Sequence, residues 1–305
     1  MSLSPYDLQS NYGDVTPIDQ DDGPSPIAPI AYSTEYSTAM SYFRALVRNN
    51  EMSKRALDLT SEIIKHNPAH YTVWNYRQQI LFALNENLTA ELDFIKRLAR
   101  DNPKNYQLWY HRQVIVEKLS DCSNEVAFVN EVLDDDAKNY HAWSYRQWIN
   151  THFNLWDDEL PFIDKLLNDD VRNNSAWNYR YFVVFHDPDV AEENLIESEI
   201  NYTMEKIRQT PNNISPWNYL RGILEKSSRD IQELESFCKE FTDNDINSPH
   251  AMGWLVDIYG NRAKNGDEQA KEDAIKICES LANTHDTIRK AYWEYRKDEL
   301  ATPSS

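Results

Sequence analysis

Apolar residues recur at helical spacing over most of the chain, beginning near Tyr36. Intervals of three and four residues mark one face of an amphipathic helix. Two early segments show this spacing: Tyr42, Phe43 and Leu46, then Ala56, Leu59 and Ile63. With only six glycines and nine tryptophans among 305 residues, the pattern predicts an all-α protein of close-packed helices.

The helical pattern is organised as an internal repeat. Trp74, Trp109, Trp143 and Trp177 stand 35, 34 and 34 residues apart, and looser copies follow at Trp217, Trp254 and Trp293. A polar break precedes each of the first four tryptophans, and an arginine follows three residues after it. A period of this size predicts stacked helical hairpins, each with a first helix, a break and a second helix that carries the tryptophan.

The breaks contain signals for the start of each second helix. Pro103 stops the preceding helix, and Asn105, Asn139 and Asn173 stand where a side-chain acceptor would cap the next one. Tryptophan and arginine, three residues apart, share a helix face and predict a packing ladder along the repeats. We expect the arginines to pair with the acidic ends of neighbouring first helices, such as 134–136 and 169–170.

Composition divides the chain into three parts. Residues 1–32 hold five prolines and no helical periodicity, so we expect an arm that is extended or disordered until it lies against something. Residues 33–300 form the hairpin repeats, and residues 301–305 a loose tail.

Charge and cysteine usage narrow the function classes. A formal net charge of −19 repels a phosphate backbone and argues against nucleic-acid binding. Cys122, Cys238 and Cys278 are widely separated, so we interpret them as core residues in a reducing compartment. The sequence shows neither a signal peptide nor a membrane span, which favours a cytoplasmic location.

Several possible catalytic or metal motifs fail on inspection. His66 and His70 have a metal-ligand spacing, but Pro68 lies between them in a helix break. The chain contains no phosphate-binding glycine loop, and none of its aspartate clusters has the Asp-Asp-x-x-Asp spacing that many prenyl-diphosphate enzymes use to hold magnesium. We therefore predict no metal site in this chain.

The remaining candidates for a functional site are the residues that differ from one repeat to the next. Lys104 and Lys138 stand just ahead of predicted helix starts, where free amides, the positive end of the helix dipole and an ammonium group together suit an anion such as a diphosphate. Lys104, Gln107, Tyr140 and His141 could converge on one such ligand. The alternative is that they are ordinary solvated residues of the cap regions.

The breaks resemble those of a known family. The matching segments are 103–107, 136–143, 170–175, 255–259, 286–290 and, in the arm, 22–26. Together they are similar to the α subunit shared by protein farnesyltransferase and type I protein geranylgeranyltransferase. The resemblance extends from Asp22 to Arg296, in loops as well as on the tryptophan ladder.

This resemblance implies a right-handed, crescent-shaped solenoid wrapped around a β subunit that holds the catalytic zinc. The expected reaction transfers a farnesyl or geranylgeranyl group from its diphosphate to the cysteine thiolate of a C-terminal CaaX box, as in Ras- and Rho-type GTPases. Prenyl length would be set by the β subunit. The resemblance leaves open whether magnesium accompanies the diphosphate.

The resemblance also implies roles for individual residues. Lys104 would stabilise the departing diphosphate, and Tyr140 and His141 would hydrogen-bond it. Asn139 and Tyr106 would support them. Gln107 would meet the C-terminal carboxylate of the protein substrate, and Tyr71 would touch the rim of the substrate site.

Two other functions compete with this interpretation. A non-catalytic tetratricopeptide-like scaffold shares the period of about 34 residues, although arginine stands where the Trp-x-x-Leu-Gly pattern has leucine. The other is the α subunit of a Rab geranylgeranyltransferase, which would act on an escort-bound Rab protein.

Overall fold

The described residues of the chain are helical. A computed structural model describes residues 10–187, 193–242 and 246–302, and these ranges contain no β-strand. They fall into two compact units, Met1–Leu155 and Trp156–Ser305. The predicted all-α class of repeated helical hairpins is confirmed.

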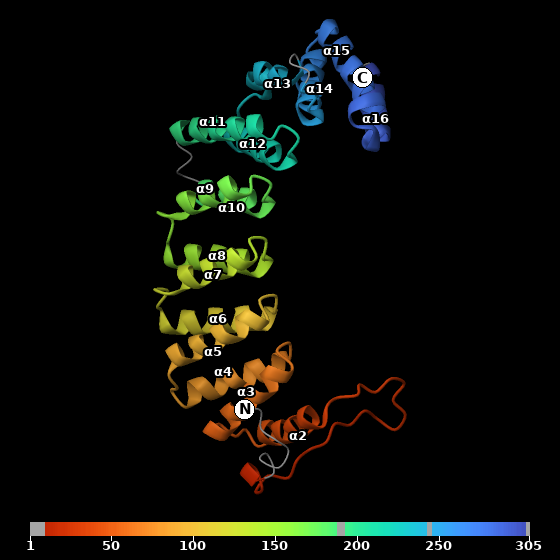
Figure 1. Cartoon of the computed structure of the whole chain (residues 1–305). Coiled ribbons are helices and arrows are strands. Elements are labelled where there is room, and N and C mark those ends of the chain that lie inside the picture. Colours follow the sequence, from red (N-terminus) through yellow and green to blue (C-terminus); the bar gives the residue numbers. More distant parts are fainter. Residues whose placement is uncertain (1–9, 188–192, 243–245, 303–305) are drawn as a thin grey trace. The chain divides into compact units, whose positions relative to one another are not determined.

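The first unit is a series of hairpins that follow one another along the chain (Figure 1). The hairpins are α3 (Lys54–His66) with α4 (Tyr71–Ala83), α5 (Leu88–Asp101) with α6 (Tyr106–Leu119), and α7 (Glu125–Asp135) with α8 (Tyr140–Phe153). The preceding helix, α2 (Thr34–Arg48), packs on the first hairpin, and α4, α6 and α8 pack on one another in order.

The second unit continues the hairpin pattern with less regular elements. Its helices are α9 (Glu159–Asp169), α10 (Asn174–Val184), α11 (Glu193–Gln209), α12 (Ile214–Ser227), α13 (Glu235–Thr242), α14 (Pro249–Lys264), α15 (Glu268–Ser280) and α16 (Lys290–Ala301). Short turns of 3-10 helix, Ile231–Leu234 and Thr287–Arg289, and one π-turn, Leu281–His285, lie between some of them.

The predicted asparagine caps are confirmed. The Asn105 side chain accepts the amide of Leu108 at 3.0 Å, and Asn139 and Asn173 each accept two amides of the next turn at 2.9–3.2 Å. Each cap satisfies amides that the first turn of a helix leaves without an intrahelical partner. The second helices α6, α8 and α10 therefore begin where the sequence indicates.

The tryptophans of the first five copies also fix the break in front of their own helix. The Trp109 indole N–H donates to the Pro103 carbonyl at 2.8 Å, and the tryptophans of the neighbouring copies reach back six residues in the same way. These rings are 6% exposed or less. The tryptophan ladder is thus structural, as predicted, and in these five copies it ties the break to the helix that follows.

The arginines of the ladder are buried, and Arg77, Arg112 and Arg180 pair with acidic residues of neighbouring first helices as predicted, although with glutamates and not with the aspartate clusters 134–136 and 169–170. Arg112 makes two hydrogen bonds of 2.6 Å with the carboxylate of Glu125, which begins the next hairpin, and Tyr145 donates to the same carboxylate at 2.7 Å. Arg77 with Glu91 and Arg180 with Glu199 repeat the arrangement. The arginines pair with these glutamates and not with the aspartate clusters, because the glutamates face the ladder inside the stack. A buried guanidinium needs a carboxylate partner there.

One copy of this network has histidine in place of tyrosine. His111 Nε2 lies 3.0 Å from the Glu91 carboxylate, in the position that Tyr145 takes against Glu125. Burial lowers the pKa of His111, and the adjacent carboxylate opposes this shift. Burial raises the pKa of Glu91, but hydrogen bonds from His111 and Arg77 outweigh it and bring the value to about 2.

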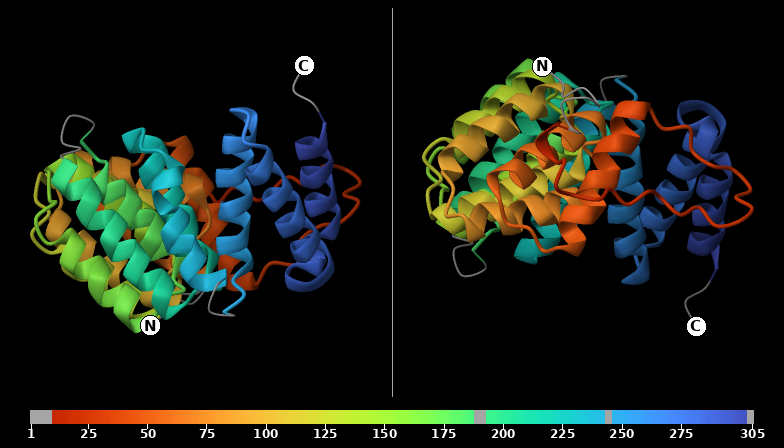
Figure 2. Two further views of the ribbon diagram at one scale, coloured as in Figure 1. Left: turned by 90° about the horizontal axis from the view of Figure 1, so that it is seen from above. Right: turned by 90° about the horizontal axis from the view of Figure 1, so that it is seen from below.

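Part of the proline-rich arm is anchored to the hairpins. Tyr12 is 1% exposed and donates to the Arg55 carbonyl at 2.6 Å, while Asp14 pairs with the Arg55 guanidinium. Ile18 is bonded to α2 through the Ser41 carbonyl and the Arg44 guanidinium, and the loop that follows reaches beyond the hairpins of its unit in Figure 1 and in both views of Figure 2. Residues 1–9 of the predicted arm, and 303–305 of the predicted tail, lie outside the described residues.

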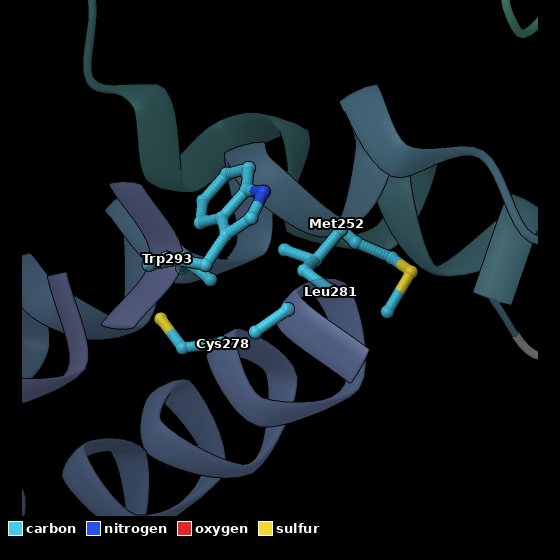
Figure 3. Packing of buried hydrophobic residues seen from close by; sticks show 6 residues of the cluster. Met252, Cys278, Leu281 and Trp293 are labelled. Carbon is cyan, nitrogen blue, oxygen red and sulfur yellow. The ribbon is translucent and has the colours of Figure 1, made fainter. Parts of the chain in front are cut away.

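A small apolar core in the second unit explains one of the cysteines. Cys278 is fully buried among Met252, Leu281 and Trp293, as Figure 3 shows. Cys238 is buried as well, so both fill core space as predicted. Cys122 is only half-buried in the break before α7, so the interpretation as a core residue is wrong for that position.

Candidate functional site

The break between α5 and α6 presents Lys104 on a fixed backbone. The Pro103 carbonyl accepts hydrogen bonds from the Trp109 indole at 2.8 Å and from the Asn139 side-chain amide at 3.2 Å. Asn139 belongs to the next hairpin, so this carbonyl joins the two breaks. The backbone around Lys104 is therefore held from both sides.

The Lys104 side chain itself is 73% exposed. Its Nζ lies 3.3 Å from the Asp136 carboxylate, at the end of α7. The ammonium group thus stands at the break that precedes α8. It lies beside the helix start that carries the other predicted site residues.

Asn139 fixes the start of α8. Its side chain is buried, and the Oδ1 atom accepts the amides of His141 and Ala142 while Nδ2 donates to Pro103. The predicted role of Asn139 is to support its neighbours, and its contacts are those of a helix cap and a bridge between hairpins. It is the most enclosed of the predicted site residues.

Two tyrosines and a histidine meet in front of these helix starts. The Tyr106 and His141 rings are edge to face with centroids 4.3 Å apart, and the Tyr140 ring lies 5.6 Å from His141. Tyr106 and Tyr140 are 65% and 67% exposed, so their phenol groups are accessible to a ligand. The structure therefore brings residues from α6 and α8 together although they are about one repeat apart in the sequence.

The surroundings of His141 favour the neutral form of its ring. Burial lowers the pKa of the ring below its ordinary value, and a hydrogen bond with the backbone of Lys104 opposes the shift in part. A neutral imidazole has one donor and one acceptor nitrogen. A ligand that brings negative charge would favour the protonated ring, which has two donors.

Of the two predicted substrate-contacting residues, Gln107 adjoins this cluster in the sequence and Tyr71 lies one hairpin earlier. Gln107 follows Tyr106 in the first turn of α6 and is half-buried. Tyr71 begins α4, one hairpin earlier, and is 74% exposed. Its ring lies 6.4 Å from His70, and in the described part of the chain no ring contact joins it to Tyr106 or His141.

Sequence reasoning missed Asp136 as a neighbour of this site. In the sequence it is one of three consecutive aspartates at a predicted helix end. Its position in the repeat offered a signal, because the residue seven places before each of the first four tryptophans is Asn or Asp: Asn67, Asn102, Asp136 and Asp170.

The geometry suits a small, strongly charged anion. An ammonium group, two phenols and an imidazole gather at the N-terminal ends of α6 and α8, where the helix dipoles add positive potential. All of these residues belong to the first unit. In a chain with a net charge of −19, such a local concentration of donors favours an oxygen-rich anion over an acidic polymer.

Metal and membrane features are not seen in the described ranges. Within residues 10–187, 193–242 and 246–302, no three His, Cys, Asp or Glu side chains are grouped so that they could hold a metal ion. No helix in the same ranges has the length and apolar character needed to cross a membrane.

Comparison with known proteins places the hairpins in one class. The family described as "Protein prenyltransferase alpha subunit repeat" matches residues 53–84, 88–119, 122–153, 156–187 and 196–227. The first four matches contain the four regular hairpins from α3 to α10, and the fifth contains α12 and most of α11. The chain is thus a helical-repeat protein of the prenyltransferase α type.

Whole-chain relatives are more specific. The chain is 39% identical to the protein farnesyltransferase/geranylgeranyltransferase type-1 subunit alpha of Dictyostelium discoideum, over 97% of this chain and 94% of the relative. It is 47% identical to the subunit of the same name from Schizosaccharomyces pombe, with coverage of 94% and 93%. The solved structure described as Candida albicans protein geranylgeranyltransferase-I complexed with GGPP matches with a TM-score of 0.88 and 36% identity, over 95% and 98% of the two chains.

The chain therefore belongs to the family of α subunits shared by protein farnesyltransferase and type I protein geranylgeranyltransferase. This result overturns the alternative of a non-catalytic tetratricopeptide-like scaffold.

Proposed function

We propose that this chain is the α subunit of a heterodimeric CaaX prenyltransferase and that its α6–α8 edge receives the diphosphate of the prenyl donor. The observation that carries the proposal is the position of Lys104 at two adjacent helix starts: its ammonium group lies 3.3 Å from Asp136 at the end of α7, and its backbone meets the His141 ring, next to Tyr140. Family membership supplies the reaction class, and this cluster supplies the residues of the chain that fit its anionic leaving group.

In the proposed reaction, the cysteine thiolate of the protein substrate attacks C1 of the prenyl diphosphate. A C–S bond forms, the C1–O bond breaks, and the diphosphate leaves with the electron pair of that bond. Negative charge therefore grows on the leaving oxygens in the transition state. A positioned ammonium group stabilises this charge more than it stabilises the bound substrate, which lowers the barrier.

Other residues of the cluster would hold the leaving group in place. Tyr140 and His141 would donate hydrogen bonds to the diphosphate, and Tyr106 packs against the His141 ring and limits its rotation. Asn139 keeps the start of α8 in register with Lys104 through the Pro103 carbonyl. Gln107 and Tyr71 are proposed to contact the protein substrate at the margin of the site.

The remaining parts of the catalytic centre are assigned to a β subunit. We propose that it holds zinc, which would bind and activate the substrate thiolate, and that it selects farnesyl or geranylgeranyl diphosphate. The substrates would be CaaX-box proteins such as Ras- and Rho-type GTPases. A cytoplasmic location is proposed as well, and the free thiols of Cys122, Cys238 and Cys278 support it.

The role of Lys104 is tested with Lys104→Ala in the purified heterodimer. Loss of one positioned donor to a developing anion lowers kcat by about 10²-fold. Single-turnover prenylation of a CaaX peptide measures the chemical step, and Lys96→Ala removes a different exposed cation from the same hairpin as a control. Unchanged turnover in an intact Lys104→Ala heterodimer would overturn the proposed role.

A further inference from the structure

Asp136 connects Lys104 to the helix that carries Tyr140 and His141. Its Oδ2 atom lies 3.3 Å from Lys104 Nζ, and its Oδ1 atom accepts the Lys138 amide at 3.1 Å. Its backbone N–H donates to the Val132 carbonyl, and its own carbonyl accepts the Asn139 amide. Both carboxylate oxygens and both backbone groups are engaged, so the carboxylate is fixed relative to the start of α8.

Lys104, in contrast, has little else to define its direction. The side chain is 73% exposed on a break between helices. A lysine in this setting samples many rotamers, and an exposed ion pair adds little to folding stability. The contact with Asp136 therefore matters mainly for where the ammonium group points.

We propose that Asp136 is a positioning residue for the prenyl transfer, because it holds the Lys104 ammonium group at the turn that precedes Tyr140 and His141 before the diphosphate arrives. The inference rests on the proposed function of Lys104. An ammonium group has three N–H donors, so Lys104 can keep its contact with Asp136 and still donate to the diphosphate.

The negative charge of Asp136 has opposite consequences for binding and for chemistry. It repels the bound diphosphate, which weakens substrate binding, but it directs the ammonium group toward the oxygens that gain charge in the transition state. Removing the charge should therefore leave KM for the prenyl diphosphate unchanged or lower it, while kcat falls. A residue that served only the fold would not separate the two constants in this direction.

The test uses Asp136→Asn in the heterodimer. The asparagine side-chain oxygen can still accept the Lys138 amide, so the turn before α8 is retained while the ion pair is lost. We expect kcat to fall by about fivefold to tenfold, as for a catalytic group that is present but misplaced. Glu131→Gln is the matched control, because it removes another exposed ion pair between the same two hairpins, Lys96 with Glu131, away from the site. This control should retain wild-type kcat and KM.

A double-mutant cycle distinguishes positioning from a general effect. If Asp136 acts through Lys104, Asp136→Asn has no further effect on kcat in the Lys104→Ala background. An equal loss of kcat in both backgrounds, an unchanged kcat in the single variant, or a rise in KM without loss of kcat would each overturn the inference. Failure of Lys104→Ala to slow turnover would instead reject the proposed function, so the two failures are separable.

Discussion

His141 is the residue of the site whose charge can change near neutral pH. Burial lowers the pKa of its ring, which favours the neutral form in the unliganded protein. The groups that face it are Tyr106, Tyr140 and the Lys104 break, with Asp136 paired to the lysine. A diphosphate at this edge would be the strongest negative charge nearby and would raise the pKa of His141.

Prenyl diphosphate should consequently bind better as the pH falls toward the pKa of this histidine. A ligand that raises a pKa is bound more tightly at lower pH, because the complex holds the proton more firmly than the free protein does. The measurement is the affinity of the heterodimer for a prenyl diphosphate between about pH 8 and about pH 5.5, a range that spans the ordinary histidine pKa of about 6.5. His141→Gln serves as the reference, since the diphosphate's own titration affects both proteins. Identical pH profiles would show that His141 does not meet the diphosphate.

At the level of elements, the hairpins are joined by buried Arg–Glu–Tyr networks. In the Arg112–Glu125 pair both side chains are 3% exposed or less, and the Arg112 guanidinium also lies 3.8 Å from the Phe128 ring centre. Such a pair gives modest net stability compared with apolar packing, but it strongly disfavours the loss of one partner. It also permits only one register between neighbouring hairpins, because displaced hairpins would leave buried charges unpaired.

Glu125→Gln should therefore be strongly destabilising. The Arg112 charge would remain buried with only part of its hydrogen bonding, at a cost of about 3–5 kcal/mol. Denaturant titration followed by circular dichroism would detect this as a lower midpoint. Glu131→Gln, which affects an exposed pair, should change stability by less than about 1 kcal/mol. A midpoint for Glu125→Gln equal to that of this control would show that the network is dispensable.

At the level of the molecule, the first unit exposes a set of aromatic side chains on its second helices. Each is between 65% and 74% exposed: Tyr71 on α4, Tyr106 and Tyr110 on α6, and Tyr140 on α8. Isolated proteins seldom leave such groups together in water without a binding role. A subunit that covers them would stabilise the chain by mass action.

The isolated chain should aggregate or unfold at a lower temperature than the heterodimer. A partner present at about 100 times its Kd would add about 2.7 kcal/mol to the stability of the folded state. Thermal scans of the chain alone and with a co-expressed β subunit, at matched concentration, measure the difference. A cooperative transition of the isolated chain at the same temperature as the complex would contradict the prediction.

Short-range signals in the sequence determined the helices of this protein and the positions where they begin. The sequence predicted the helices and their starts from three signals: the 34-residue period, the tryptophan spacing, and Asn105, Asn139 and Asn173. These signals suffice because caps and helical periodicity act within a few residues. The variation at Lys104, Tyr140 and His141 predicted which break is unusual.

Only the tertiary structure decided which side chains meet across hairpins. The contact of Lys104 with Asp136 and the choice of carboxylates for the arginines depend on the register in which one hairpin packs on the next. The burial of Tyr12 depends on the arm lying against α2 and α3. The acidic chain offers many carboxylates at similar distances in sequence, and local periodicity does not choose among them. Packing does choose, because it buries the ladder and leaves each guanidinium to the carboxylates that face it inside the stack.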